Sequence, residues 1–166
     1  MLLSILHYPD ERLRIVAKPV HDFDHRLQIL INDMLETMYQ ANGIGLAATQ
    51  VGINLRVIVM DLSENRNEPI TFINPSLSEI SKETNAYEEG CLSVPNINEV
   101  VIRPKTVIIN AKDIYGRDFT LPADGLLATC IQHEIDHLDG KVFIDRISKL
   151  KKSRIDDKIK KSKKNK

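Results

Sequence analysis

The stretch Gln132-His-Glu-Ile-Asp-His-Leu-Asp-Gly140 carries the strongest signal in the sequence, because it contains the pattern His-Glu-x-x-His. Residues four apart share one face of a helix, roughly 6 Å apart along the axis, so the imidazoles of His133 and His137 can converge on one ion. Glu134 projects nearby and can exchange protons with a water on that ion. Two unrelated surface histidines are the alternative, which the intervening Glu and the apolar helix disfavour. The pattern predicts a metal-binding helix at the centre of the fold.

We expect this helix to run from Asp124, a plausible N-terminal cap, to Leu138, with Gly140 at the left-handed position that favours glycine. A second helix near the N-terminus is predicted by apolar residues that recur every three or four positions. Asp22 or Asp24 can cap it, and the glycines at 43 and 45 follow it. Its apolar stripe is Leu27, Leu30, Ile31, Met34, Leu35, Met38 and Tyr39.

Short runs rich in Val and Ile predict strands at 55–60, 71–73 and 106–111. The segment 113–117 reads as a hairpin turn that returns through Phe119 and Leu121. The end of the chain reads as a basic helix with a broken apolar stripe. The predicted class is α+β, with short antiparallel β-sheets around a central metal-binding helix, one N-terminal helix and one C-terminal helix.

Composition places the chain among globular proteins. Its 166 residues are 42% hydrophobic and 28% charged, which fits one compact domain and excludes a disordered class. We expect a cytoplasmic protein with no membrane contact, because the start lacks the features of a signal peptide and no apolar run is long enough to span a bilayer. Only Cys91 and Cys130 occur, and such sparse cysteine usage is typical of a reducing compartment.

The net charge of zero hides an asymmetry. Residues 149–166 carry ten Lys or Arg and two Asp, which leaves thirteen basic and twenty-one acidic residues in the rest of the chain. Such a tail can bind a polyanion, or it can be a solvated Lys-rich end. We therefore divide the chain into a catalytic domain at 1–147 and a basic C-terminal helix or tail at 148–166.

A catalytic metal site needs a third protein ligand. A third histidine in the long metzincin pattern would stand at 143, where Phe143 occurs, and no Glu follows Glu134. A cysteine or a downstream aspartate remains. Cys130 lies about 10 Å from position 137 along the helix, too far to share an ion, and is better read as core. Cys91 comes from a non-helical segment and can approach the helix, so it is the better of the two thiols.

Three segments together resemble the bacterial peptide deformylases: GIGLAATQ at 43–50, EGCLS at 89–93 and QHEIDHLDG at 132–140. The resemblance covers essentially the whole chain. It implies that Cys91, His133 and His137 bind one divalent ion, usually Fe(2+), with Zn, Ni or Co as alternatives. The implied reaction is hydrolytic removal of the formyl group from the N-terminal formyl-methionine of newly synthesised polypeptides, with release of formate.

The same resemblance implies roles for the surrounding residues. Glu134 is the catalytic acid and base, while the side chain of Gln50 and the backbone N–H of Leu92 stabilise the oxyanion. The expected substrate-binding residues are Gly45, Ile44, Tyr87, Glu89, Leu126 and Thr129, with Cys130 in the same pocket. Without the resemblance, Gln50 reads as an ordinary polar loop residue, and Ile44 and Leu126 as core. Asn98 departs from the family, whose members commonly have arginine there, and Arg103 lies farther along.

Two other functions stay open from the residues. One is a metallopeptidase with the His-Glu-x-x-His pattern. The other is a ribosome- or RNA-binding protein in which the metal is structural. For the deformylase, the expected partners are N-formylmethionyl nascent peptides and, through the basic helix, the ribosome near its exit tunnel. We also expect a monomer.

Overall fold

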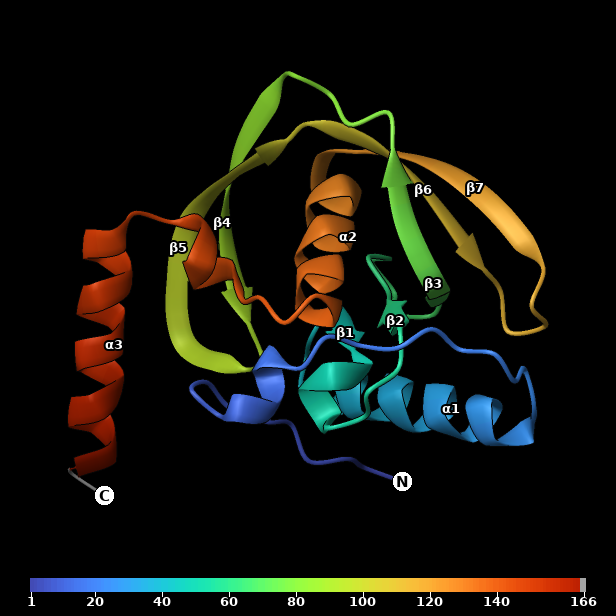
Figure 1. The fold of residues 1–166 in the computed structure, drawn as a ribbon, viewed down its shortest axis with the longest axis horizontal. Helices are drawn as coiled ribbons and strands as arrows, with labels where there is room; N and C mark the ends of the chain where they lie inside the picture. The colour runs from blue at the N-terminus through green and yellow to red at the C-terminus, as the bar shows by residue number, and fades with distance from the viewer. Residues whose placement is uncertain (165–166) are drawn as a thin grey trace.

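The computed structural model describes residues 1–164, in which α-helices and antiparallel strands combine into an α+β fold, as predicted (Figure 1). The α-helices are α1 (His25–Gln40), α2 (Gly125–Leu138) and α3 (Lys149–Lys164). Short 3-10 helices are η1 (Glu11–Arg14), η2 (Ala48–Val51) and η3 (Phe143–Arg146). Within residues 1–164, none of the helices combines the length and the hydropathy that a membrane-spanning segment needs.

The strands form two antiparallel sheets. They are β1 (Gly45–Ala47), β2 (Val57–Met60), β3 (Ile70–Ser78), β4 (Thr84–Cys91), β5 (Val94–Pro104), β6 (Thr106–Lys112) and β7 (Asp118–Asp124). The first sheet has the order β1-β2-β3-β6-β7, and the second is the β4–β5 hairpin. β1 is therefore an edge strand, which pairs only with β2 within the described residues.

Helix α1 begins where the sequence places a cap. The side chain of Asp24 accepts a hydrogen bond from the backbone N–H of Leu27 at 3.1 Å, so Asp24 rather than Asp22 caps the helix. The apolar stripe of α1 then packs on one face of the five-stranded sheet. Its buried members include Leu27, Ile31, Met34 and Met38.

The sheet is covered on both faces, and β2 shows why. Its side chains alternate, with Val57 and Val59 packed among the residues of α1 and Ile58 and Met60 packed toward α2. All four are fully buried. Helix α2 is thus held between the sheet on one side and the β4–β5 hairpin on the other, at the centre of the molecule (Figure 1). The predicted central helix is confirmed.

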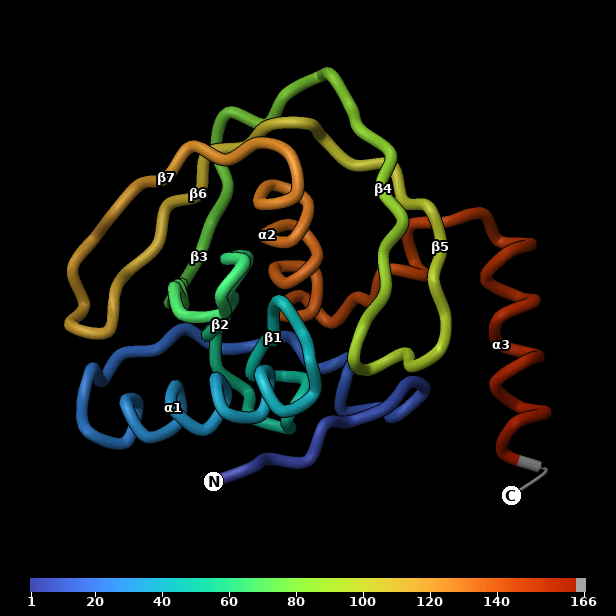
Figure 2. The backbone as a smooth tube through the Cα atoms, turned by 180° about the vertical axis from the view of Figure 1, so that it is seen from behind, coloured from blue at the N-terminus to red at the C-terminus, as the bar shows by residue number. Residues whose placement is uncertain are grey.

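The β4–β5 hairpin was not predicted from the sequence, although it has the largest strand pairing in the fold. Its outer side carries α3, as both views show (Figures 1 and 2). Ile155 of α3 is 6% exposed and packs with Val94 and Val101 of β5 and with Phe143 of η3. The C-terminal helix therefore has a small apolar anchor on the hairpin.

Candidate metal centre

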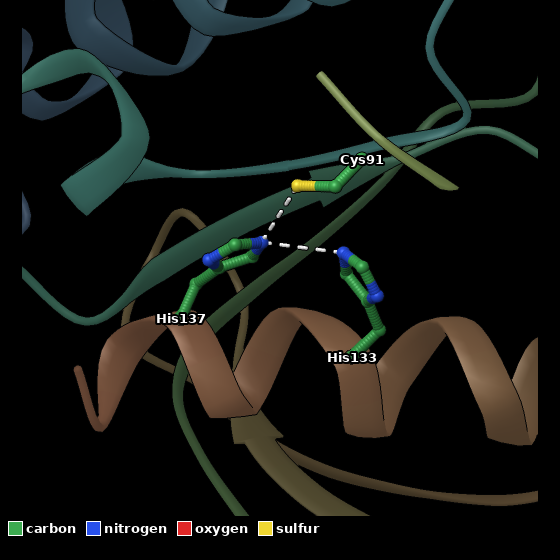
Figure 3. A group of neighbouring side chains, drawn as sticks. All are labelled: Cys91, His133 and His137. Atoms are coloured by element: carbon green, nitrogen blue, oxygen red, sulfur yellow. Dashed lines mark hydrogen bonds between the residues drawn. The ribbon is translucent and has the colours of Figure 1, made fainter. Parts of the chain in front are cut away.

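Three side chains from two elements converge beside α2. His133 and His137 lie one turn apart on this helix, and Cys91 ends β4 (Figure 3). The Nε2 atom of His137 lies 3.2 Å from the Sγ atom of Cys91 and 3.2 Å from the Nε2 atom of His133. One ligand atom from each residue lies within 4.8 Å of the other two. The fold thus brings together the three predicted ligands.

These atoms fit one metal ion. Tetrahedral bonds of about 2.0–2.3 Å hold ligand atoms about 3.3–3.7 Å apart, close to the spacing seen here. The Nδ1 atom of His133 lies 2.9 Å from Glu89, so its N–H donates to that carboxylate and leaves Nε2 free for an ion. Burial lowers the pKa of His137 well below its usual value. His137 is therefore neutral, as a metal ligand must be.

Glu134 lies next to the ligands, shut off from solvent. Its Oε1 atom is 3.7 Å from the Nε2 atom of His133, and its buried Oε2 atom has no hydrogen-bond partner among residues 1–164. Burial raises the pKa of Glu134 to about 7, against the opposing effect of His133 and Arg103. A carboxyl group with that pKa can both take and return a proton near neutral pH.

The side chain of Gln50 is fixed next to the cysteine. Its Oε1 atom accepts the backbone N–H of Ala47 at 2.9 Å. Its Nε2 atom donates to Ser93 at 3.1 Å and lies 3.5 Å from the sulfur of Cys91. Leu92 and Ser93 form the two-residue turn between β4 and β5, so the backbone of Leu92 stands beside the same ligand. The amide of Gln50 is thus a donor already held in place.

A cleft of about 410 Å³ opens in front of these groups. Every residue predicted to bind substrate lines it, as do Gln50, Leu92, Cys130 and Glu134. Gly45 leaves little room beside these groups, because a Cβ atom there would lie 3.0 Å from the sulfur of Cys130 and 3.2 Å from the side chain of Glu134. The edge strand β1 therefore passes directly over the carboxylate of Glu134.

Comparisons with known proteins agree with this geometry. A sequence model of the family "Polypeptide deformylase" matches residues 2–153. The chain belongs to the polypeptide deformylase family. A peptide deformylase from Chromobacterium violaceum is 59% identical over 163 residues, which cover 98% of this chain and 97% of the relative. One from Neisseria meningitidis is 58% identical over 163 residues, with the same coverage.

Solved structures of peptide deformylases share the fold. One from Legionella pneumophila has a TM-score of 0.92 at 46% identity and covers 100% of this chain and 99% of its own. Another from Synechococcus elongatus, in complex with actinonin, has a TM-score of 0.90 at 45% identity. The match covers 94% of this chain and 86% of that structure's chain. The deformylase activity of the chain is the hydrolytic removal of the N-terminal formyl group from nascent peptides.

In this deformylase a buried chain of charges supports the ligands. Arg103 donates to both carboxylate oxygens of Glu89, at 2.7 and 3.0 Å, and to Asp136 at 2.8 Å. Asp136 also accepts from Arg146 of η3. Glu89 was predicted to bind substrate, and that stays a prediction. Its carboxylate is bonded to His133 and Arg103, so it fixes the orientation of the His133 ring.

Sequence reasoning missed part of the deformylase cleft. Val94, Pro95 and Ile97 line it from the β4–β5 hairpin, and Asn98 lies there opposite Gly90. Arg103 does not line the cleft, because it is 5% exposed and paired with acids beneath it. A predicted hairpin around the two-residue turn after Cys91 would have placed Val94, Pro95 and Ile97 in the cleft. No signal in the sequence pairs Arg103 with Asp136.

Proposed function

We propose that this enzyme performs deformylation with a ferrous ion held by Cys91, His133 and His137. A thiolate and two imidazoles form a donor set that suits Fe, Zn, Ni or Co, and the resemblance to bacterial deformylases favours iron. When bound, the ion acts as a Lewis acid and lowers the pKa of a water. The support is the convergence of the three ligand atoms beside a buried carboxylate.

Glu134 is the proposed general base and acid. It removes the proton from the attacking water and returns it to the nitrogen of the leaving amine. Negative charge grows on the formyl oxygen as the carbon becomes tetrahedral. The amide of Gln50 and the backbone N–H of Leu92 donate hydrogen bonds to that oxygen, and both stand next to Cys91 in the fold.

The substrate peptide is proposed to lie along β1. As an edge strand, β1 has backbone groups on its open side that can pair with an extended peptide, and Gly45 permits close approach. The methionine side chain then enters the part of the cleft lined by Ile44, Tyr87, Leu126, Thr129 and Cys130. A formyl carbon bears only hydrogen, so the tight space at Gly45 and Glu134 accepts it and refuses larger acyl groups.

Formate release from formyl-Met-Ala-Ser tests these roles. Wild-type protein, prepared without oxygen and loaded with iron, should release formate and leave the acetylated peptide intact. Glu134→Gln should lower kcat by at least about a hundredfold while retaining the ion. Glu83→Gln, on the surface, is the control. A wild-type rate of formate release in Glu134→Gln would contradict the role of Glu134 as general base.

Metal analysis of protein purified without oxygen tests the choice of iron. We expect about one iron per chain and loss of that ion in Cys91→Ser. If only the zinc-loaded protein were active, the proposal of iron would be contradicted, but the assignment of the three ligand residues would stand.

We also propose that the enzyme is a cytoplasmic monomer and that its α3 binds the ribosome. The basic charge of α3 supports the ribosome contact. Exposed lysines of α3, such as Lys158, Lys160 and Lys161, would contact RNA phosphates in a salt-dependent way. Changing these three to Glu should abolish cosedimentation with ribosomes and spare formate release from the tripeptide. Equal cosedimentation of wild type and variant would contradict the proposal.

A further inference from the structure

A second pocket of about 310 Å³ lies away from the catalytic cleft, where η1, the segment after α2, η3 and the first turn of α3 meet. Four basic side chains and one acid line it: Arg14, Lys141, Arg146, Lys152 and Asp145. Arg146 also bonds to Asp136 in the charge network beneath the metal centre, and Arg14, Lys141 and Lys152 have no part in the proposed deformylation mechanism. The pocket therefore lacks an explanation in the chemistry of the formyl group.

Backbone packing builds this pocket. Gly140 adopts φ +78°, and a Cβ atom there would lie 2.5 Å from the carbonyl oxygen of Arg14. This close approach sets Arg14 beside Lys141. The guanidinium of Arg14 then donates to the carbonyl of Gly140 at 3.2 Å and to Asp145. Segments far apart in the chain thus bring their basic side chains to one hollow.

The positive charge of the pocket exceeds what its acids neutralise. Burial opposes ionisation of Asp145, but hydrogen bonds from Arg14, the Val142 amide and Lys152 hold its pKa well below the usual value. Asp145 is thus already a bonded anion. Counting Asp136 against Arg146 as well still leaves an excess of two positive charges.

Free hydrogen-bond donors remain on these cations. Arg146 uses its Nε and Nη2 atoms on Asp136, which leaves Nη1 without a protein acceptor among residues 1–164. Lys152 gives one bond to Asp145, at 2.9 Å, and keeps two donor hydrogens. Lys141 is exposed and has no ion-pair partner within the described residues. A guanidinium edge with two ammonium groups suits an anion with several oxygens.

We propose that this pocket binds a phosphate group. The group's oxygens would accept from Arg146, Lys141 and Lys152, while Arg14 and Asp145 hold the walls in place. The phosphate can come from a free anion or from an RNA backbone, since both offer the same oxygens. The inference goes beyond the ribosome contact proposed for α3, because an isolated phosphate would occupy the pocket without RNA.

The test compares two double variants of equal net charge. The pocket pair, Lys141→Gln/Lys152→Gln, removes the two ammonium groups of the pocket. The control pair, Lys18→Gln/Lys82→Gln, removes two exposed lysines elsewhere. Each metal-loaded protein is titrated with inorganic phosphate, with chemical shifts of backbone amides followed by NMR. Each is also titrated with a labelled single-stranded RNA of twelve nucleotides, with fluorescence anisotropy as the readout.

With inorganic phosphate we expect saturable changes in the amide chemical shifts of residues 141–152 in wild type and in the control pair. The pocket pair should show no such changes. If RNA is the physiological source, the pocket pair should also bind RNA about five- to tenfold more weakly and lose about one unit of the salt slope. A phosphate effect without an RNA effect assigns the pocket to free anions. Equal behaviour of the two pairs toward both ligands would overturn the proposal.

Whether wild type binds RNA is a separate test of the ribosome contact proposed for α3. If wild type binds no RNA but the pocket pair loses the phosphate shifts, the pocket stands and the partner proposed for α3 fails. Formate release from the tripeptide should stay at the wild-type rate in both pairs, which shows that each variant is folded.

Discussion

Glu89 and Arg103 join the metal ligands to the rest of the protein. Both are buried, and Arg103 bridges Glu89 on β4 to Asp136 on α2. In such a buried network the removal of one partner leaves the others uncompensated. The orientation of His133 therefore depends on residues that are not among the proposed metal ligands.

Glu89→Gln should weaken metal binding by about ten- to a hundredfold, because a neutral amide accepts the His133 N–H less strongly than a carboxylate does. Metal affinity is measured by competition with a chelator. Glu88→Gln, on the neighbouring exposed residue of the same strand, serves as the control. Equal affinity in both variants would argue against the orienting role.

Asp61 makes stability depend on acid pH. Its burial acts to raise the pKa, but hydrogen bonds from Ser63, Tyr39 and the amide of Glu68 lower it from 3.8 to about 2. A depressed pKa contributes stability that is present above pH 3.8 and is lost as the pH falls toward 2. The gap in urea midpoint between wild type and Asp61→Asn should therefore narrow between pH 5 and pH 2. A constant gap would contradict the shift.

The helices end at residues with defined tasks. Asp24 closes the first turn of α1, and Gly140 lets the chain leave α2 against the backbone of Arg14. For each of these two residues the chain has a matched control residue of the same type that lacks the contact. Asp22 makes no such bond, and Gly52 has the same φ as Gly140 with open space around it.

Asp24→Ala should lower the free energy of unfolding by about 1 kcal/mol, since the Leu27 amide loses its acceptor. Asp22→Ala should change it by less than about 0.5 kcal/mol, as expected of an exposed residue. Urea denaturation of both variants checks this. A larger loss in Asp22→Ala would place the cap two residues earlier.

Gly52→Ala should cost about 1–2 kcal/mol of unfolding free energy, from the left-handed backbone alone. Gly140→Ala has the same φ of +78° and adds a 2.5 Å clash with the carbonyl of Arg14. Its loss should be larger than that of Gly52→Ala, and the difference measures the clash. Equal thermal midpoints would show that the backbone of Arg14 moves away freely.

Taken as a whole, the molecule is a central helix enclosed by two sheets, with α3 attached outside (Figure 2). The attachment rests on Ile155 in the core of the hairpin and on a hydrogen bond of 2.8 Å from Tyr8 to Asp156. The proposed boundary near 148 therefore lies next to a small apolar interface.

Ile155→Ala should release α3 and cost about 2 kcal/mol or more of local stability, because a buried side chain is truncated. Hydrogen exchange of the α3 amides should become faster, while the amides of α2 keep their protection. Leu150→Ala, at a side chain that is 62% exposed, is the control. Slow exchange of α3 in both variants would mean that polar contacts hold the helix.

Local patterns carried much of the fold and part of the site. The spacing of His133 and His137, the stripe of α1 and the bounds of α2 are properties of single helices, so they are visible along the chain. Asp124 stands at the N-terminal end of α2 as predicted, but its side chain makes no capping hydrogen bond. The approach of Cys91, the pairing of Arg103 with Glu89 and Asp136, and the basic pocket beside Gly140 depend on strand register and on contacts between distant segments. Tertiary packing decided these features, because neither register nor the burial of a charge is encoded in residue spacing.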